Sequence, residues 1–405
     1  MRAILHCDLN NFYASCECLN NKALLGKPVA VGGREEDRHG VIVAANYEAK
    51  KFGVHCGVTV HEAKKLCPDV IICPPHFDLY NKYSRLVRNI YEEYTDQVEV
   101  FSIDECWLDV THSKIFGTPI QIANTIRERV KKEVGLTISV GVSFNKTFAK
   151  IGSDLKKPAA TTVISEDNFK RIVWRLPVSD MFGVGRKTTE KLLKFGINTI
   201  GDLANTKADF LKKEFGKVGE ELFKKANGLD DEAVANVLDE VVPKSIGNST
   251  TFYKDLTERK DISLAFLVLS ESVVERMIKK NIKFARTLSI TVRDADLKFY
   301  QRQCKIFPSR NSEFFAKTAE RLFYESFSHI KRVRLLGVAV SDFDEELQLS
   351  IFNEDKKDKG LDELMLSIRN KFGKDKIVRG SALTNEKIAK ALDREQLDKN
   401  MKDDN

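Results

Sequence analysis

Two short acidic segments carry the side chains whose types and spacing could do chemistry. Asp8 ends an apolar run that begins at Ile4, and Asp104 and Glu105 stand together between two apolar runs. Mg²⁺ prefers oxygen ligands and is held in proteins by a few carboxylates together with substrate phosphates. Two such ions, about 3.5–4 Å apart, can bind the attacking and leaving oxygens of an in-line displacement. Three carboxylates at adjacent strand ends could therefore form a two-metal site for nucleotidyl transfer.

Each segment alone could equally be an ordinary acidic turn, because Asp and Glu are common at strand ends. Two features favour the metal site. Asp8 directly follows a strand that the pattern predicts to be buried, where an unpaired carboxylate is costly unless a cation or hydrogen bonds compensate it. Asp104 and Glu105 lie within a β-hairpin pattern over residues 98–110, which could pack beside that strand.

Helix and strand patterns alternate around these segments. After a first strand in residues 1–10, we predict a helix, a hairpin, a helix and a strand at residues 80–94, 98–110, 120–134 and 136–142. This order suits a ferredoxin-like α+β domain. The intervening residues 11–77 resemble a small insert, with strands at 29–31 and 41–45 and a helix after Thr59.

The rest of the chain divides into three parts. Residues 167–233 have the pattern of short helices, punctuated by Pro177 and by glycines at 183 and 185, and residues 234–243 resemble a linker. Residues 244–345 mix strands at 287–293 and 333–340 with amphipathic helices at 264–279 and 312–327. The charged tail contains one predicted helix, at residues 361–372, whose binding surface the sequence leaves open.

Composition bounds the class of protein. A chain of 405 residues with 42% hydrophobic content suggests two to four domains with cores of their own. No segment approaches the ~20 continuous apolar residues that a membrane span requires, and polar residues from Asp8 onward interrupt any signal peptide. The eight cysteines form no C-x-x-C pair, so we expect reduced thiols in a cytoplasmic protein and no zinc ribbon.

The excess of positive charge is local. The net charge is +7; residues 168–233 hold 13 basic and 10 acidic side chains, and residues 244–345 hold 19 and 13. A local basic excess is typical of proteins that bind a polyanion. A solvated basic surface remains the alternative, because charge alone does not identify a partner.

Four segments together resemble a known family. They are D-L-N-N-F-Y-A-S-C-E (8–17), A-N-Y-E-A-K-K-F-G-V (45–54), S-I-D-E-C-W-L-D (102–109) and G-V-S-F-N-K-T-F-A-K (141–150). In this order they closely resemble the Y-family translesion DNA polymerases, those of the bacterial DNA polymerase IV type in particular. The resemblance runs from residue 1 to about residue 345.

The resemblance implies an α+β multidomain polymerase shaped like a right hand. The palm, which is ferredoxin-like, would comprise residues 1–10 and 78–166, and small fingers residues 11–77. A helical thumb with a helix-hairpin-helix would span 167–233, a linker 234–243 and an α/β little finger 244–345. Residues 346–405 would hold a clamp-binding peptide and a charged tail.

The family also assigns roles to residues of the catalytic segments. Asp8, Asp104 and Glu105, with the backbone carbonyl of Leu9, would bind two Mg²⁺ ions that position the primer 3′-hydroxyl and the dNTP. Relatives often carry Asp where this chain has Asn10, but that position is not among the usual metal ligands.

Further family positions concern the incoming nucleotide. Tyr13 matches the steric gate that excludes a 2′-hydroxyl, and the neighbouring Phe12 is expected to pack in the core. Tyr47, Lys50 and Lys157 match positions that bind the triphosphate. Lysine 50 replaces the usual arginine, so a point charge stands in place of a bidentate fork. Two more departures are Ala44, where a hydroxyl residue is usual, and Ala160 or its neighbour, where glycine is usual.

Contacts to DNA and to a sliding clamp follow from the resemblance as well. In the thumb, Gly183 and Gly185 would bring backbone N–H groups to a phosphate, beside Arg186 and Lys187. Predicted phosphate contacts of the little finger are Lys244, Ser245, Thr250 and Arg286. The peptide Q-L-S-I-F resembles a clamp-binding motif, in which Gln348, Leu349, Ile351 and Phe352 would make the contacts.

The sequence thus predicts a monomeric, cytoplasmic, error-prone DNA polymerase that copies primed templates from dNTPs and lacks a proofreading exonuclease. Two other classes stay open at this point. A nucleotidyl cyclase could use the same palm topology, although it would leave the thumb pattern unexplained. A non-catalytic DNA or clamp adaptor is the other, although it would have no need of three clustered carboxylates.

Overall fold

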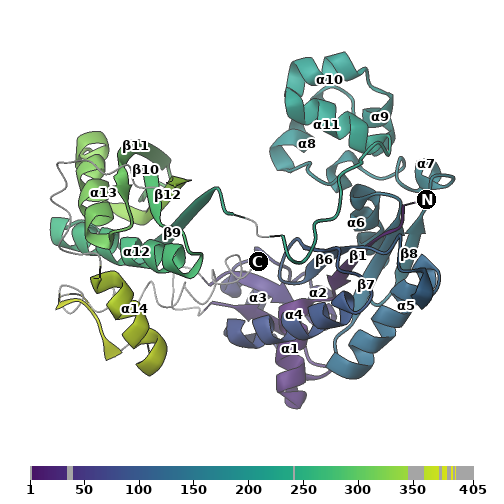
Figure 1. Cartoon of the computed structure of the whole chain (residues 1–405), viewed down its shortest axis with the longest axis horizontal. Helices are drawn as coiled ribbons and strands as arrows, with labels where there is room; N and C mark the ends of the chain where they lie inside the picture. The colour runs from purple at the N-terminus through teal and green to yellow at the C-terminus, as the bar shows by residue number, and fades with distance from the viewer. Residues whose placement is uncertain are drawn as a thin grey trace. The chain divides into compact units, whose positions relative to one another are not determined.

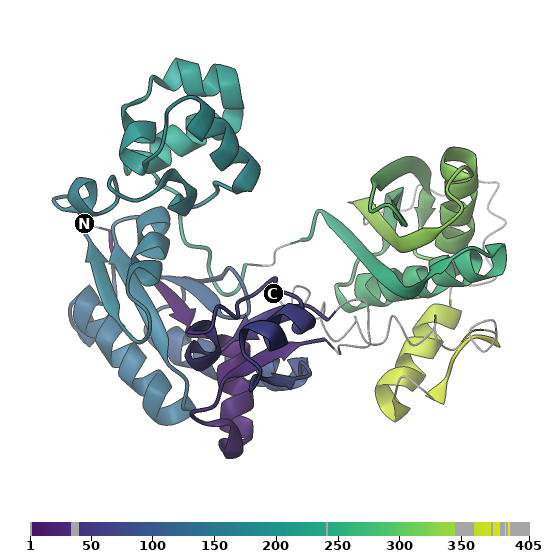
Figure 2. The same cartoon turned by 180° about the vertical axis from the view of Figure 1, so that it is seen from behind.

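The computed structural model describes residues 2–33, 40–239, 242–344, 360–373 and 376–380, together with Asn385 and Ile388. The chain forms two compact units, one on each side of residues 240–241. In Figures 1 and 2 the first unit runs from purple to teal and the second from green to yellow. No helix in these ranges is long and apolar enough to cross a bilayer.

A five-stranded sheet with the order β5-β6-β1-β7-β8 forms the centre of the first unit. Its strands are β1 (Ile4–Leu9), β5 (Val98–Val100), β6 (Glu105–Asp109), β7 (Ile138–Ser143) and β8 (Thr161–Ile164). Strand β1 pairs antiparallel with β6 and β7, and β8 is parallel to β7. Strands β5, β6, β1 and β7 lie side by side in the ferredoxin-like order. The predicted palm topology and the predicted hairpin beside the first strand are therefore confirmed.

Helices cover both faces of this sheet. Helices α4 (Phe77–Glu92) and α5 (Pro119–Arg129) lie on one face and α6 (Lys146–Leu155) lies on the other (Figures 1 and 2). Helix α5 begins with a capping box between Thr118 and Gln121 and has Pro119 in its first turn, which explains its sharp start.

Two glycines allow α6 to approach the sheet closely. A Cβ atom on Gly141 of β7 would lie 1.8 Å from the carbonyl oxygen of Ala149, and one on Gly152 would lie 3.1 Å from the Cα of Gly141. Any side chain at position 141 would therefore push the helix away. This close packing brings the side chains of α6 onto β1 and β6, where the acidic residues lie.

A small sheet with the order β3-β2-β4 forms the insert after β1. Its strands are β2 (Val29–Gly32), β3 (Ile42–Ala45) and β4 (Ile71–Cys73), and its helices are α1 (Phe12–Asn20), α2 (Tyr47–Lys50) and α3 (Val60–Leu66). Asn46 caps α2 by accepting from the N–H of Ala49, and its amide also donates to the carbonyl of Lys27. The predicted strands, β2 and β3, and helix α3 are present, whereas α1, α2 and β4 were not predicted.

Short helices complete the first unit and share a hydrophobic core with Phe148 and Ile151 of α6 and Ile164 of β8. They are α7 (Phe169–Ile172), α8 (Arg186–Lys194), α9 (Ile200–Asn205), α10 (Ala208–Phe215) and α11 (Lys217–Ala226). The start of the predicted linker packs against the palm. Val234 is buried against Ile4 and Trp107, and the N–H of Ala235 donates to Glu99.

The second unit repeats the palm's element order with a different sheet order. Its strands are β9 (Ser245–Leu256), β10 (Phe284–Asp294), β11 (Phe299–Ser309) and β12 (Val333–Asp344), in the order β11-β10-β12-β9. Helices α12 (Arg259–Lys279) and α13 (Ser312–Phe327) pack together and contact this sheet. The predicted strands and helices of this part are present. The finer division into palm, fingers, thumb and little finger stays a prediction.

The tail helix α14 (Leu361–Phe372) has the predicted bounds and docks on α12. Met365 and Leu366 are buried there. Four charged residues, which we call the tail anchor, fasten it: Glu271, Asp362, Arg369 and Arg379. Arg379 lies 2.6 Å from Glu271 and 2.8 Å from Asp362, and Arg369 lies 3.1 Å from Glu271.

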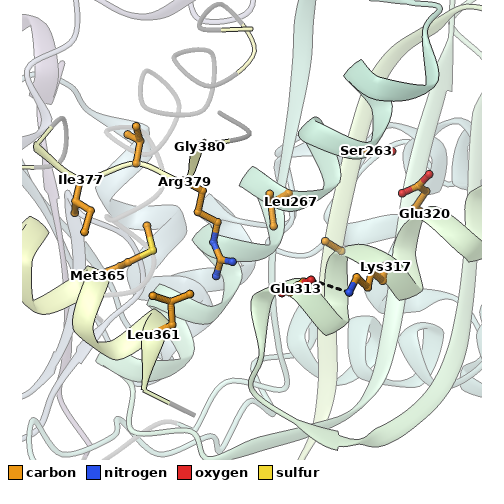
Figure 3. Close-up of a pocket in the computed structure, with 12 residues that line it drawn as sticks. Ser263, Leu267, Glu313, Lys317, Glu320, Leu361, Met365, Ile377, Arg379 and Gly380 are labelled. Carbon is orange, nitrogen blue, oxygen red and sulfur yellow. Dashed lines mark ion pairs between the residues drawn. The ribbon is translucent and has the colours of Figure 1, made fainter. Parts of the chain in front are cut away.

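A cavity of about 560 Å³ adjoins the tail anchor. Figure 3 shows Leu361, Met365 and Ile377 of the tail on one side of it and Leu267 of α12 on the other. Asp362 in addition accepts from the N–H and the hydroxyl of Ser312, at the start of α13. The tail helix is thus part of the second unit's packing.

Candidate active site

Strand pairing brings the two acidic segments together. In the antiparallel register of β1 and β6, Asp8 lies directly opposite Glu105. The N–H of Leu9 donates to the carbonyl of Asp104 at 3.0 Å, which holds the second acidic residue beside the end of β1. The three carboxylates therefore meet at one end of the palm sheet, as the sequence predicted.

The carboxylates open into a cavity of about 430 Å³. All eight residues predicted to act on metal or nucleotide line it: Asp8, Leu9, Tyr13, Tyr47, Lys50, Asp104, Glu105 and Lys157. The strands and helices that supply them come from the palm and from the insert after β1. Asn11, Cys56 and Asp154 also line the cavity and were not predicted.

Each carboxylate has one oxygen held by a protein donor. Lys157 Nζ lies 2.8 Å from Asp8 Oδ2, and the Ser102 hydroxyl donates to Asp104 Oδ1 at 2.6 Å. Glu105 Oε2 pairs with Lys150 and lies 3.3 Å from His6 Nε2. The other oxygens of Asp8 and Glu105 bind no partner in the described part of the chain.

Burial and pairing act in opposite directions on these groups. Burial raises the pKa of Asp8 to about 7, although the nearby Lys157 lowers it in part. Burial likewise raises the pKa of Asp104. Burial also raises the pKa of Glu105, but its contacts with His6 and Lys150 outweigh this and bring it to about 2. Asp8 and Asp104 are therefore poorly compensated carboxylates, whereas Glu105 is fully ionised.

The donor set fits a hard divalent cation. Carboxylate oxygens are the ligands that Mg²⁺ prefers, and a nearby cation would stabilise the ionised forms of Asp8 and Asp104. Within the described residues no three His, Cys, Asp or Glu side chains already stand close enough to hold a metal ion. The carboxylates are instead held by Lys150 and Lys157, so binding a metal requires local side-chain movement.

Tyr13 stands at the cavity wall with aromatic support. Its ring stacks on Tyr80 at a centroid distance of 4.4 Å, and Phe77 meets it edge-on at 5.9 Å. Phe12 is 3% exposed, so its predicted packing role is confirmed. A ring fixed on two sides presents a rigid surface to whatever enters the cavity.

Two asparagines position the parts of the cavity that carry its basic side chains. Lys50 donates to Asn11, and its ammonium lies 5.2 Å from the centre of the Tyr47 ring. Asn10, which is 2% exposed, accepts from the N–H of Ala159 at 2.9 Å and so ties the loop that carries Lys157 to the end of β1. Ala159 has a left-handed φ of 53°, which this hydrogen bond helps to hold.

Comparison with known proteins decides the family. Residues 7–154 match the impB/mucB/samB family model, and residues 243–351 match the model of the same family's C-terminal domain. Residues 179–230 match the model described as the DNA polymerase-iota thumb domain. DNA polymerase IV of Acetivibrio thermocellus is 48% identical over 391 residues, which cover 94% of this chain and 98% of the relative. The chain belongs to the Y-family DNA polymerases.

Other relatives and a solved structure agree. DNA polymerase IV 1 of Bacillus subtilis is 38% identical over 95% of this chain and 94% of its own length. The structure of a Y-family DNA polymerase chimera, Dbh-Dpo4(243-245)-Dbh, matches with a TM-score of 0.75 at 27% identity, over 84% of this chain and 99% of that chain. The protein is therefore a DNA-directed DNA polymerase of the translesion class, and the predicted fold class is confirmed. Template DNA and dNTPs are its substrates, and its catalysis depends on divalent metal ions. The cyclase and adaptor alternatives are set aside.

The thumb of this Y-family polymerase presents an open helix start. Gly183 has a φ of 94°, which favours glycine, and Gly185 precedes α8 without a side-chain cap. Arg186 and Lys187 are exposed, and Arg186 pairs with Glu190 at 3.0 Å. The predicted phosphate-binding feature is thus accessible in the structure.

The predicted DNA contacts of the little finger differ in exposure. Lys244 and Ser245 are exposed at the start of β9, and Arg286 is half-buried on β10. Thr250 is wrong as a DNA contact, because its side chain is 1% exposed on the inner face of β9. Strand alternation places every second residue of β9 inside, which the sequence pattern had not resolved there. The clamp residues Gln348, Leu349, Ile351 and Phe352 lie outside the described residues.

Sequence reasoning missed the residues behind the Y-family polymerase's carboxylates. His6 is fully buried, and its Nδ1 lies 2.8 Å from the Ser153 hydroxyl of α6. Lys150, which lies on the same helix α6, pairs with Glu105. A signal was available: His6 alternates with Asp8 on β1, so both face the same side of the sheet. Its significance depends on α6, whose position no local pattern predicts.

Proposed function

We propose that this DNA polymerase joins a dNTP to a primer 3′-hydroxyl with two Mg²⁺ ions held by Asp8, Asp104, Glu105 and the carbonyl of Leu9. The observation that carries the proposal is the register of Asp8 opposite Glu105, with Asp104 beside them in one cavity. When bound, the ions would supply charge neutralisation at the attacking oxygen and the phosphates. A pair of buried, incompletely compensated carboxylates supports this assignment.

Three side chains are proposed to bind the triphosphate. Lys50 and Lys157 offer two positive charges in the same cavity, and Tyr47 adds a hydroxyl beside Lys50. Lys157 holds Asp8 and Asp154, each at 2.8 Å, and would exchange Asp8 for a phosphate when the nucleotide enters. Because lysine offers a point charge, this exchange requires no particular plane of approach.

Tyr13 is proposed as the steric gate against ribonucleotides. The stacking of its ring on Tyr80 supports this role, since a ring that cannot move aside excludes a 2′-hydroxyl more strictly. Tyr13→Ala should admit rNTPs by removing that surface. The measurement is the ratio of kcat/KM for dCTP and CTP opposite template guanine. The control is Phe52→Ala, which truncates an exposed aromatic residue that does not line the cavity. Unchanged discrimination in Tyr13→Ala would remove Tyr13 from this role.

Template DNA is proposed to contact Gly183, Gly185, Arg186 and Lys187 in the thumb and Lys244, Ser245 and Arg286 in the little finger. Their accessibility, apart from the half-buried Arg286, supports this set. We also propose that residues 348–352 bind a bacterial sliding clamp and that the enzyme acts as an error-prone monomer without proofreading. A cytoplasmic location fits its eight free cysteines.

Primer extension tests the metal site. With Mg²⁺ and dNTPs on a primed template, Glu105→Ala should lower the rate by on the order of 10²–10³-fold, because an electrostatic group at the reacting centre is lost. Asp109→Asn is the matched control, since Asp109 ends the same strand but does not line the cavity. Full extension by Glu105→Ala would rule out the proposed metal site, and equal losses in both variants would indicate damage to β6.

A further inference from the structure

Lys150 and His6 converge on the same atom of the proposed metal-binding carboxylate. Both contact Oε2 of Glu105, Lys150 as an ion pair and His6 with its Nε2 at 3.3 Å. Oε1 binds no partner among the described residues. The carboxylate is therefore held at one oxygen and open at the other.

The two residues are themselves fixed from behind. The Ser153 hydroxyl donates to the backbone carbonyl of Lys150 at 2.8 Å and lies 2.8 Å from Nδ1 of His6, so it attaches His6 to α6. The Lys150 ammonium also lies 4.7 Å from the centre of the Phe101 ring and is 15% exposed at its side chain. Gly141 lets α6 lie close enough for these contacts.

We infer that Lys150 is a positioning residue, which holds Oε2 of Glu105 and leaves Oε1 for a divalent metal ion. The inference rests on the proposed function of Glu105 as a metal ligand. A carboxylate with two free oxygens can rotate between rotamers, and ordering it on metal binding costs conformational entropy. Lys150 removes that freedom in advance through its ion pair with Oε2. Such outer partners commonly change metal affinity or activity by about 10–100-fold when they are removed.

A purely structural role is the competing account, and α6 offers a matched control for it. Lys146 lies one turn before Lys150, pairs with Glu99 at 2.7 Å and stands 4.8 Å from the Trp107 ring centre. Its two carboxylate partners, Glu99 and, at 3.0 Å, Glu232, do not line the cavity. Lys146→Met and Lys150→Met thus remove the same kind of ion pair from the same helix, but only the second touches a proposed metal ligand.

The test uses the full chain bound to primed DNA and a non-hydrolysable dNTP analogue. Mn²⁺ affinity is read by electron paramagnetic resonance, and the Mg²⁺ concentration for half-maximal incorporation is measured with dNTP. In Lys150→Met we expect the Mn²⁺ affinity to fall, and the Mg²⁺ concentration for half-maximal incorporation to rise, by about tenfold or more. Both quantities should stay at the wild-type value in Lys146→Met and recover in part in Lys150→Arg. Lys150→Ala, which also removes the donor, carries the comparison if the Met variant does not fold.

Wild-type metal affinity in a folded Lys150→Met, with a loss of stability like that of Lys146→Met, would overturn the inference. Failure of the proposed function looks different. In that case Glu105→Gln would retain wild-type Mn²⁺ affinity and extension, whatever the Lys150 variants do. Loss of metal affinity in Glu105→Gln but not in Lys150→Met would leave the proposed metal site intact and reject the positioning role alone.

Discussion

The active-site cavity and the tail anchor both gather charged side chains away from water, but they are built from different cations. In the tail anchor, two arginines share Glu271 so that Arg379 takes Oε1 and Arg369 takes Oε2. In the cavity, Lys150 and His6 both contact Oε2 of Glu105, and Oε1 stays open. In the cluster that stabilises the fold, both carboxylate oxygens have a cationic partner. In the cluster that would bind a ligand, one carboxylate oxygen is left without a partner.

The choice of lysine or arginine follows the same division. Arginine is a planar fork whose several donors fix the geometry of its partners, which suits a permanent contact between α12 and α14. Lysine is a single point of charge that can leave one oxygen for another. Lys157, which bridges Asp8 and Asp154, can thus change partners without disturbing the surrounding packing.

Asp8→Asn gives the largest effect expected from this comparison. Primer extension should fall by on the order of 10²–10³-fold, because a charged group at the reacting centre is lost. The free energy of unfolding at pH 8, measured with urea, should not decrease, since the buried and poorly compensated carboxylate is replaced by a neutral amide. A clear loss of stability would mean that Asp8 belongs to the fold-supporting kind of cluster.

Glu271→Ala should have the opposite effects, a loss of stability with no loss of polymerase activity. Removing the carboxylate leaves Arg369 and Arg379 without a shared partner, and we expect the second unit to lose about 3 kcal/mol of stability. Single-nucleotide incorporation on bound primer should remain at the wild-type rate. Urea unfolding and hydrogen exchange in α14 measure the first effect.

The control for that change lies at the start of the same helix. Glu258 pairs with Lys260 at 2.8 Å in full contact with solvent, so Glu258→Ala should hardly change stability. Equal effects of the two substitutions would show that the tail anchor contributes no more than a surface pair.

The pH dependence of the metal-free protein tests the same comparison through stability alone. Burial raises the pKa of Asp8 from 3.8 to about 7, so the folded state binds a proton that the unfolded chain has released. Its contribution to stability is complete below pH 4 and is lost as the pH rises through about 7, with a slope of at most about 1.4 kcal/mol per pH unit. Urea titrations from pH 4.5 to 8 should show this slope in the difference between wild type and Asp8→Asn. The stability of wild type minus that of Asp8→Asn should therefore fall as the pH rises, and a rise of this quantity with pH would contradict the raised pKa.

Local patterns predicted the elements well because each element's signal is contained in its own residues. The hairpin around Asp104 and the tail helix at 361–372 were both found from the spacing of apolar residues. The metal and nucleotide residues were found through the family's motifs, and the cavity brings all of them together. The roles proposed for them stay predictions until the variants are measured.

The residues that sequence reasoning missed depend on packing between distant elements. Lys150 meets Glu105 across 45 positions of the chain, and only the close approach of α6 at Gly141 makes this possible. Thr250 was misassigned because a resemblance identifies a strand but not which face of it lies inward. The docking of α14 requires Glu271, a residue that appears in the sequence as one of many acids on a long helix.

Strand β1 is buried on both faces, with His6 and Asp8 on one side and Leu5 and Cys7 on the other. A gain or loss of one codon within this strand would keep the reading frame and the hydrophobicity, yet it would reverse every side chain beyond that point. The Asp8 side chain would then point to the face of the sheet that Cys7 occupies now. The gene can therefore change in length only outside this segment, because even a pair of codons, which would keep the faces, would move Asp8 from its place opposite Glu105.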